Sequence, residues 1–331
     1  MAKITIIGAG VVGCATAWAL SGRGADVTLV EQFEPGHPRG SSHGRTRIVR
    51  LAYPDPAWVA LAEESLDAWR ALEAESGREL LGLYGLVELC ANVELTSRDV
   101  LAARGIEHRL LDEQELGRLG VTLPAGWVAL WQAEAGVVYA ERALEALLEL
   151  ARAQGVRVET GRRVESVDHV DADADVVVVT AGAWAPKLVS GLPVRVTRET
   201  VAYFNRAGPP TPSIGELDPV TRGHAMYALH DPVHGLKAGA HHAGHEADPD
   251  QAAPADPQLV ERIADWVRAR FPDVDPEPAG SESCLYTNTA DESFVLERRG
   301  RVVVGSACSG HGFKFAPAVG RRLADLALED G

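Results

Sequence analysis

Cysteine is scarce in this sequence of 331 residues, which contains only four cysteines and no C-x-x-C pair. The four are spread along the chain from Cys14 to Cys308. A small disulfide-linked scaffold needs a dense cysteine framework, and a zinc ribbon or thioredoxin motif needs closely spaced pairs. The sequence therefore excludes these classes, and we expect reduced thiols.

Long apolar runs and an excess of positive charge are also lacking. The apolar runs, such as Val176–Thr180, are far shorter than the roughly 18 residues of a membrane span. A strand pattern starts directly after Lys3, without the features of a secretory signal, so we expect a cytoplasmic protein with no membrane partner. The formal net charge of −15 argues against a non-specific nucleic-acid binder, which needs a basic surface.

Lysine is rare among the basic residues, because only Lys3, Lys187, Lys237 and Lys314 are lysines out of 32. The position of a lysine is therefore more informative than usual. Hydrophobic residues make up 46% of the chain and charged residues 24%, which is typical of a globular protein and excludes disorder of the whole chain. The length fits one large α/β domain or two smaller ones.

The clearest unit lies at residues 4–31. A short apolar strand at Ile4–Ile7 precedes the turn Gly8-x-Gly10-x-x-Gly13, and a helix pattern and a second strand ending at Glu31 follow. The glycines permit a tight turn, the approach of a pyrophosphate and close packing of helix on strand, and the acid can bind a ribose hydroxyl. The unit predicts a dinucleotide site on a parallel sheet. The motif alone does not separate FAD from NAD, and a purely structural glycine turn is the alternative.

The rest of the chain mixes helix and strand patterns. We predict helices at 56–80, 140–154, 258–270 and 317–328, a buried strand at 174–180 and antiparallel strands within 195–245. An acidic, proline-containing linker lies at 246–257. Because nucleotide-binding patterns occur at both ends and in the middle, the domains are expected to be discontinuous in sequence.

Two further stretches carry candidate chemistry. Residues 40–50 place three arginines within six positions, which favours recognition of a phosphate or carboxylate by guanidinium groups; a solvated basic loop is the alternative. Residues 283–289 surround Cys284, for which a buried small hydrophobic side chain is the alternative reading.

Two glycine-containing segments hold the remaining candidates. Residues 305–317 form a second glycine-rich turn into a helix and include Lys314, and residues 235–241 include Lys237. Nearby, His241-His242-x-x-His245 has the spacing of metal ligands, but the surrounding pattern is strand and turn without a carboxylate-bearing helix. We therefore expect no metal site and read His242 and His245 as surface histidines.

Together these stretches resemble the D-amino-acid-oxidase-like FAD-dependent oxidoreductases, in particular the branch of monomeric sarcosine oxidase and N-methyltryptophan oxidase. The likeness covers nearly the whole chain. The combination of Cys284-Leu285-Tyr286-Thr287 with Ser309–Phe315 is specific, and we would not expect it in a nicotinamide enzyme. The segments 99–135 and 205–235 match the family pattern poorly, so the identity of the substrate is open.

The resemblance implies a role for each matching residue. Cys284 would carry FAD covalently through its sulfur, Lys237 would activate oxygen near flavin N5, and Arg47 would lie beside the flavin. Arg50 and Lys314 would bind a substrate carboxylate, with His241 and Tyr286 around the amine. The remaining implied FAD contacts are Gly8, Gly10, Val12, Gly13, Glu31, Ser41, Ser42, Arg45, Thr46, Val164, Gly182, Trp184, Gly310, His311, Gly312 and Lys314.

The fold class that follows is α/β, with a Rossmann-like FAD-binding domain interleaved with an α+β substrate domain built on an antiparallel sheet. We expect the first at 1–82, 138–195 and 282–331, and the second at 83–137 and 196–281. The implied activity is oxidation of a secondary amine or amino acid (sarcosine, another N-methyl amino acid, proline or pipecolate), with hydride transfer to flavin N5, an imine product and reduction of O2 to hydrogen peroxide. A monomer is compatible with the resemblance.

Other functions stay open at this point. A biosynthetic flavoenzyme that oxidises a cyclic or tethered amine would use the same motifs. A dehydrogenase with another electron acceptor would differ only around Lys237. A nicotinamide dehydrogenase would use the first motif alone, and a non-catalytic relative would keep the fold without the chemistry.

Overall fold

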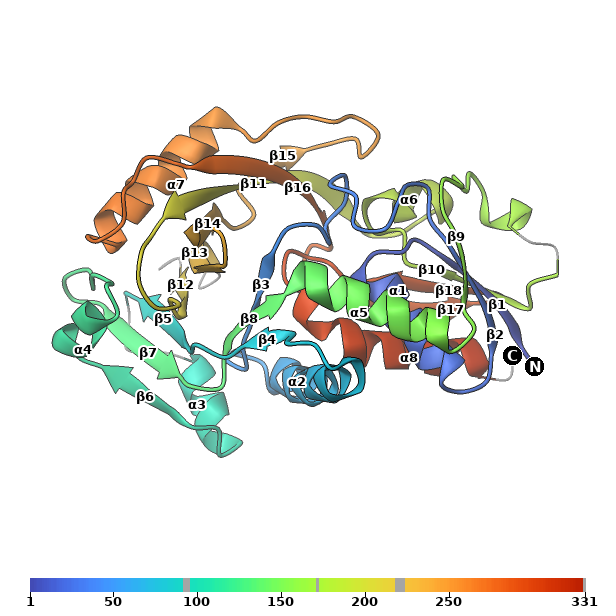
Figure 1. Ribbon diagram of the computed structural model, residues 1–331, viewed down its shortest axis with the longest axis horizontal. Helices are drawn as coiled ribbons and strands as arrows, with labels where there is room; N and C mark the ends of the chain where they lie inside the picture. Colours follow the sequence, from blue (N-terminus) through green and yellow to red (C-terminus); the bar gives the residue numbers. More distant parts are fainter. Residues whose placement is uncertain (92–95, 171–172, 218–223, 330–331) are drawn as a thin grey trace.

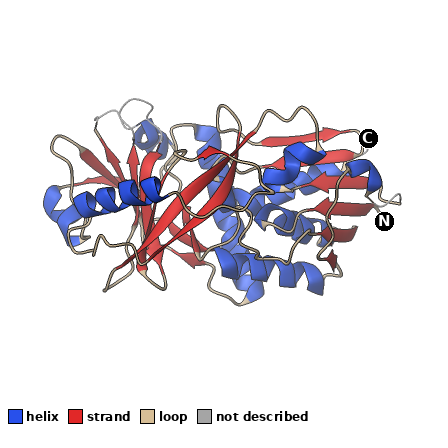
Figure 2. Ribbon diagram, turned by 90° about the horizontal axis from the view of Figure 1, so that it is seen from above, coloured by secondary structure: helices blue, strands red, loops and turns tan. Residues whose placement is uncertain are grey.

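The computed structural model describes residues 1–91, 96–170, 173–217 and 224–329. Within these residues the chain forms two large sheets, with a small three-stranded sheet between them (Figure 1). Figure 2 shows helices packed along both sheets. Among the described residues no helix is long and apolar enough to cross a membrane.

The first large sheet contains the predicted βαβ unit. Its strand order is β17-β18-β10-β1-β2-β9, and all neighbouring strands are parallel except the antiparallel pair β17–β18. The strands are β1 (Lys3–Ile7), β2 (Asp26–Val30), β9 (Arg157–Glu159), β10 (Val176–Val179), β17 (Val295–Arg299) and β18 (Val302–Ser306). The parallel core confirms the α/β class predicted from the glycine turn and the valine run.

Both faces of this sheet are covered, as a parallel sheet requires. Alternate residues such as Ile6 and Val178 pack in one core with α1 (Val11–Ser21), α5 (Ala140–Ala153) and α8 (Ala316–Leu328). The intervening residues, such as Val177 and Val179, pack in a second core with 3₁₀ turn η1 (Val167–His169) and helix α6 (Ala185–Leu188). The β-branched side chains of β10 therefore serve two cores, which explains the uninterrupted apolar run.

The second large sheet is mixed and holds nine strands. The order is β15-β11-β14-β13-β12-β5-β7-β6, β16 pairs with β11, and β12–β5 is parallel while its other pairs are antiparallel. The bounds are β5 (Leu86–Cys90), β6 (His108–Leu111), β7 (Val128–Gln132), β11 (Arg195–Asn205), β12 (Ser213–Leu217), β13 (His224–Asp231), β14 (Gly235–Ala240), β15 (His245–Glu246) and β16 (Gly280–Asn288). Helix α7 (Pro257–Arg270) packs on one face through Ile263 and Val267 (Figure 1).

Short elements connect the two large sheets. The small sheet has the order β3-β8-β4, from Thr46–Val49, Gly136–Tyr139 and Leu81–Gly82. Helix α2 (Pro56–Ser76) packs against α8, while α3 (Thr96–Ala103) and α4 (Glu113–Arg118) lie near β6 and β7 (Figure 1). Turns η2 (Gly182–Trp184) and η3 (Gly312–Phe315) complete the list.

The end of one predicted helix differs from the structure, and one strand bears on the predicted domain boundaries. The helix predicted at 56–80 ends at Ser76, because Gly77 adopts a left-handed conformation with φ 66° and caps it. Cys284 lies on strand β16, which pairs with β11 in the mixed sheet, although the predicted boundaries group residues 282–331 with the cofactor domain. The division into two domains stays a prediction.

Candidate active site

A long cavity lies between the two large sheets and reaches segments from the whole length of the chain. Its lining comes from the turn after β1, the loop before β3, the β10–η2 turn, strands β11, β13, β14 and β16, and the segment from β18 to η3. Every residue predicted for the site lines this cavity except Gly13 and Arg45. The fold thus brings together motifs that are as far apart in the sequence as Gly8 and Lys314.

The turn after β1 places backbone atoms directly at one end of the cavity. Gly8 has φ 102°, and a Cβ there would lie 2.7 Å from the carbonyl oxygen of Thr180, so no other residue fits. Helix α1 starts after Gly10 with no side-chain cap, so its first amides point toward the cavity end. Gly13 faces away and packs against the Gly8 carbonyl, the helix–strand role that its spacing indicates.

Glu31 is buried beside this turn. Its Oε2 accepts a hydrogen bond of 2.7 Å from the Ala9 amide, and its Oε1 accepts one of 3.0 Å from the Phe33 amide. The carboxylate therefore joins the glycine turn to the end of β2. Val164, Gly182 and Trp184 line the same part of the cavity, where the Trp184 indole also donates to Asp250 (2.8 Å).

The arginine-rich loop at residues 40–50 runs along the cavity, and Arg47 and Arg50 line it while Arg45 does not. Ser42 Oγ accepts from the Val11 amide at 3.1 Å, and Ser41 Oγ donates to the Leu285 carbonyl, so the two serines join the loop to α1 and β16. Arg47 donates to the carbonyl oxygens of Thr46 and Ser41, both at 2.9 Å.

Arg45 does not reach the cavity. Its Nε donates to the fully buried carboxylate of Asp231 at 2.7 Å, and its guanidinium lies over the Tyr203 ring. The structure therefore places Arg45, an FAD contact implied by the resemblance, in an ion pair that joins the loop to β13 and outside the residues that line the cavity.

Alternate residues of four neighbouring strands form one wall of the cavity. Because successive side chains of a strand point to opposite faces, the residues that line the cavity are spaced by two. They are Val201 on β11, Tyr227 and Leu229 on β13, Lys237 on β14 with His241 just beyond it, and Glu282, Cys284 and Tyr286 on β16. Tyr227 and Glu282 were not predicted, although alternation from Lys237 and Cys284 along paired strands was a signal that could have found them.

Lys237 and Cys284 lie near each other on this wall. Burial, reinforced by the nearby Arg47, lowers the pKa of Lys237 to about 7. Burial raises the pKa of the Cys284 thiol to about 11, while Arg47 and Lys237 act in the opposite direction. Near neutral pH the lysine is therefore present both with and without its proton, and the thiol keeps its own.

Arg50 and Lys314 line another part of the cavity, and a carboxylate outside the lining pairs with Arg50. Arg50 donates to Glu88 Oε1 and to the Ala52 carbonyl, both at 2.9 Å, and Glu88 is almost completely buried. Lys314 donates to the His311 carbonyl at 2.8 Å; its burial and the nearby Arg50 hold its pKa well below the usual range. The Arg50 guanidinium lies 4.1 Å from the centre of the Tyr53 ring. Sequence reasoning missed Glu88, which lies 38 positions from Arg50 with no local motif.

His241, Tyr286 and the second glycine turn meet between these two groups. Tyr286 Oη lies 3.5 Å from His241 Nδ1. Gly310 has φ 72°, and a Cβ there would lie 2.5 Å from the Tyr286 ring and 2.6 Å from the His241 ring. Glycine is thus required for the turn to approach both side chains. Burial holds the pKa of Tyr286 well above its usual value, so its hydroxyl remains a donor.

His311 and Gly312 also line the cavity, next to η3. Burial and the neighbouring Lys314 lower the pKa of His311 to about 3, so its imidazole is neutral. The His311 Nε2 atom lies 3.0 Å from the Glu292 carbonyl, which fixes the ring against the loop after β16.

Comparison with known proteins agrees with this architecture. The family model described as FAD dependent oxidoreductase (DAO) matches residues 3–326. The peroxisomal sarcosine oxidase of Homo sapiens is 35% identical, with 98% of this chain and 91% of that protein covered. The monomeric sarcosine oxidase of Streptomyces avermitilis is 33% identical, with 98% and 93% covered.

A solved structure extends the comparison. The open form of NikD, described as an unusual amino acid oxidase essential for nikkomycin biosynthesis, superposes with a TM-score of 0.86 at 26% identity, covering 100% of this chain and 95% of that one. The family match spans almost the whole chain, and the residues that line the cavity carry the motifs from which the resemblance was predicted. The chain therefore belongs to the family of FAD-dependent oxidoreductases of the DAO type.

Proposed function

We propose that this protein is a FAD-dependent oxidase that acts on the CH–NH group of a secondary amine or amino acid and carries FAD covalently on Cys284. One observation carries the proposal: a single cavity joins the glycine turn, Cys284 and Lys237 to the cations Arg50 and Lys314. The relatives named as sarcosine oxidases support a small amine substrate, and the name of the Streptomyces protein supports a monomer.

The residues present fit FAD. The turn at Gly8 and Gly10 leaves room for a pyrophosphate against the start of α1, where Gly10 has no side chain to cap the helix and the helix dipole favours negative charge. Glu31 lies at the end of β2, where an acid binds ribose hydroxyls. Val164, Gly182 and Trp184 would hold the adenosine half, and the segment from Gly310 to Lys314 would hold the flavin half together with Arg47.

FAD, when bound, would supply the redox chemistry: it takes a hydride equivalent from the carbon next to the substrate nitrogen and passes two electrons to O2, which gives hydrogen peroxide and leaves an imine that water hydrolyses. The protein must hold the substrate, keep its nitrogen neutral and manage charge near the reacting atoms. Arg47 and Lys237 place positive charge along the cavity wall, which disfavours a further positive charge and so favours the neutral amine.

Arg50 and Lys314 would bind the substrate carboxylate. Arg50 is partly buried and Lys314 is buried, and burial holds the pKa of Lys314 low, so an anion between the two side chains would stabilise the charged form of Lys314. Glu88 already pairs with Arg50, and the substrate carboxylate would share this guanidinium with it. The carboxylate would thereby fix the amine near His241 and Tyr286, whose hydroxyl is a donor.

Lys237 and Arg47 would serve two further steps. By stabilising a thiolate at Cys284, they would favour attachment of the cofactor through sulfur. Lys237 would also supply a cation where negative charge develops during the reduction of O2.

A second candidate is a biosynthetic oxidase of a cyclic or tethered amine. The likeness to NikD, with a TM-score of 0.86 over the whole chain, is the observation that favours it. Both candidates use the same cavity and differ only in the substrate.

The first test is the intact mass of the purified protein under denaturing conditions, with Cys284→Ser as the comparison. We expect the wild-type chain to be heavier by one FAD and the variant to show the bare mass while remaining yellow before denaturation. A bare wild-type mass would contradict the covalent link, and a colourless protein that stays colourless with added FAD would contradict the proposed function. A peroxide-coupled panel of sarcosine, other N-methyl amino acids, proline and pipecolate then distinguishes the two candidates: no peroxide from any of them would favour the biosynthetic role.

A further inference from the structure

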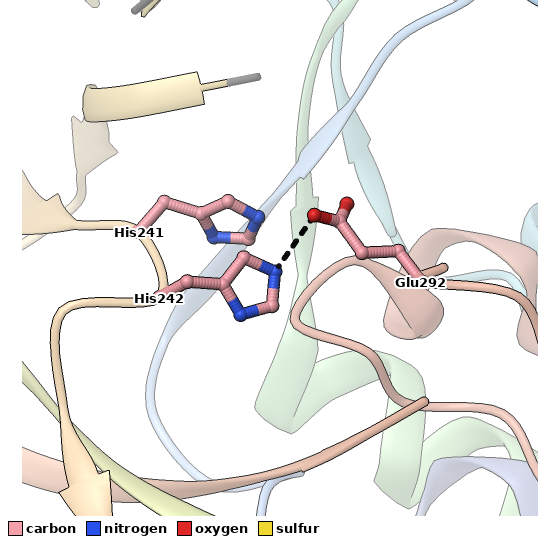
Figure 3. Close-up of side chains that lie close together, drawn as sticks. All are labelled: His241, His242 and Glu292. Carbon is pink, nitrogen blue, oxygen red and sulfur yellow. Dashed lines mark ion pairs between the residues drawn. The ribbon is translucent and has the colours of Figure 1, made fainter. Parts of the chain in front are cut away.

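Three potential metal ligands converge at the edge of the cavity. Figure 3 shows His241, His242 and Glu292, with the two imidazoles from the turn after β14 and the carboxylate from the loop after β16. One ligand atom from each residue lies within 4.8 Å of the other two. His241 also lines the cavity, whereas His242 and Glu292 are solvent-accessible, so an ion can enter from outside.

The backbone is held in an unusual conformation at two of these residues. His242 has φ 51° and Glu292 has φ 60°; Ser309 is the remaining non-glycine residue with positive φ among those described. This region is sterically costly for such side chains and is concentrated at functional sites and ligand clamps. Adjacent residues of an extended strand would point to opposite faces, but the left-handed turn at His242 puts its ring 4.1 Å from that of His241.

The spacing of the ligand atoms is close to that of a zinc site. Zn²⁺ binds nitrogen and carboxylate oxygen at about 2.0–2.2 Å in tetrahedral geometry, so two ligand atoms stand roughly 3.4 Å apart. His242 Nε2 and Glu292 Oε1 are 3.4 Å apart. The third ligand, His241, lies within 4.8 Å of the other two, so it needs to approach by at most about 1.4 Å, which rotation of an imidazole supplies.

We propose that His241, His242 and Glu292 form a binding site for Zn²⁺ or a similar borderline-soft divalent cation. Two imidazoles and one carboxylate are a donor set that such ions prefer over Mg²⁺ or Ca²⁺, which select oxygen ligands. A bound ion would join the turn after β14 to the loop after β16 and would occupy His241. Access to the cavity would then be reduced, and Zn²⁺ would act as a reversible inhibitor; this second part rests on the proposed function.

The site escaped prediction because its third ligand is 50 positions away. The sequence drew attention to His241-His242-x-x-His245, but His245 is largely exposed and its only ion-pair partner among the described residues is Asp256, at 3.9 Å. In the structure Glu292, and not His245, lies beside His241 and His242. His245 is therefore a matched control, because it is a nearby histidine outside the cluster.

The experiment measures Zn²⁺ affinity of the flavin-loaded full chain by competition with a chromophoric chelator. We expect one site in the wild type, and affinity at least about tenfold weaker in His242→Asn and in Glu292→Gln, because even changes outside the ligand shell cost about 10–100-fold. Asparagine tolerates the left-handed conformation at position 242, and the flavin spectrum checks that each variant is folded. His245→Asn should bind like the wild type, and Mg²⁺ should not compete.

Inhibition provides a second readout. Zn²⁺ should inhibit peroxide formation, a chelator should restore it, and His242→Asn should need at least about tenfold more Zn²⁺ for the same inhibition. Equal Zn²⁺ affinity in the wild type and His242→Asn, or an equal loss in His245→Asn, would overturn the site. Tight binding without inhibition would overturn the closure of the cavity, and failure to find any oxidised amine would leave the binding result standing by itself.

Discussion

Replacing Lys237 by methionine should stabilise the protein, and the gain should depend on pH. Lys237 is buried, and its pKa falls from 10.5 to about 7 on folding. At about 1.36 kcal/mol per pKa unit, this difference corresponds to about 5 kcal/mol. Because the folded-state pKa is the lower one, the folded state holds fewer protons than the unfolded state between these two values. The cost of burying Lys237 is therefore absent above pH 10.5 and grows to its full size as the pH falls to about 7.

Methionine has nearly the same length and no charge, so it lacks this pH dependence. The advantage of Lys237→Met over the wild type should be about 4 kcal/mol at pH 7.5 and should shrink by about 2–3 kcal/mol on going to pH 9.5. The assay is denaturant unfolding of flavin-free protein, wild type and variant, at both pH values. An advantage of the same size at both would refute the reasoning, because packing differences between the two side chains do not titrate.

Lys187 provides the matched control. It is 40% exposed and pairs with Asp248 and Asp250, which raise its pKa. A raised pKa gives stability that is fully present below 10.5, so Lys187→Met should show no change in its difference from the wild type between pH 7.5 and 9.5. A parallel trend in both variants would point to a general effect of pH rather than to the buried amine.

Four further outcomes follow from the site. Arg50→Ala should weaken binding of a carboxylate inhibitor by about 10–100-fold, as loss of a hydrogen bond to a charged group does. Glu88→Gln should strengthen binding of the same inhibitor by about fivefold, because Arg50 loses a competitor worth ~1 kcal/mol. Titrations that follow the flavin spectrum measure both affinities. In stopped-flow experiments, Lys237→Met should leave flavin reduction by substrate intact but slow reoxidation by O2 by about 100-fold. Gly8→Ala should be purified with little flavin, because its Cβ would lie 2.7 Å from the Thr180 carbonyl oxygen; full visible absorbance would contradict this.

Local patterns predicted the parts of the site that local physics determines. The glycine turn with Glu31 follows from backbone geometry over a few residues, whereas the expectation for Lys237 came from the family resemblance. The ion pair of Arg45 could not be predicted, because its partner Asp231 lies 186 positions away. Glu88 and Glu292 were missed for the same reason: each completes a cluster by a contact across the fold, and neither lies in a motif.

The packing of α8 on α1 has a consequence for the order in which the protein can assemble. The two helices approach so closely that a Cβ at Gly320 would lie 2.6 Å from the Ala15 carbonyl carbon. About 300 residues separate them, which a ribosome adds in about 15–60 s at about 5–20 residues per second. Throughout that interval the apolar face of α1 lacks its partner, and the segment of Gly310 and Lys314 does not yet exist. The proposed FAD site is therefore completed only after the C-terminal part of the chain has been synthesised and α8 can pack on α1.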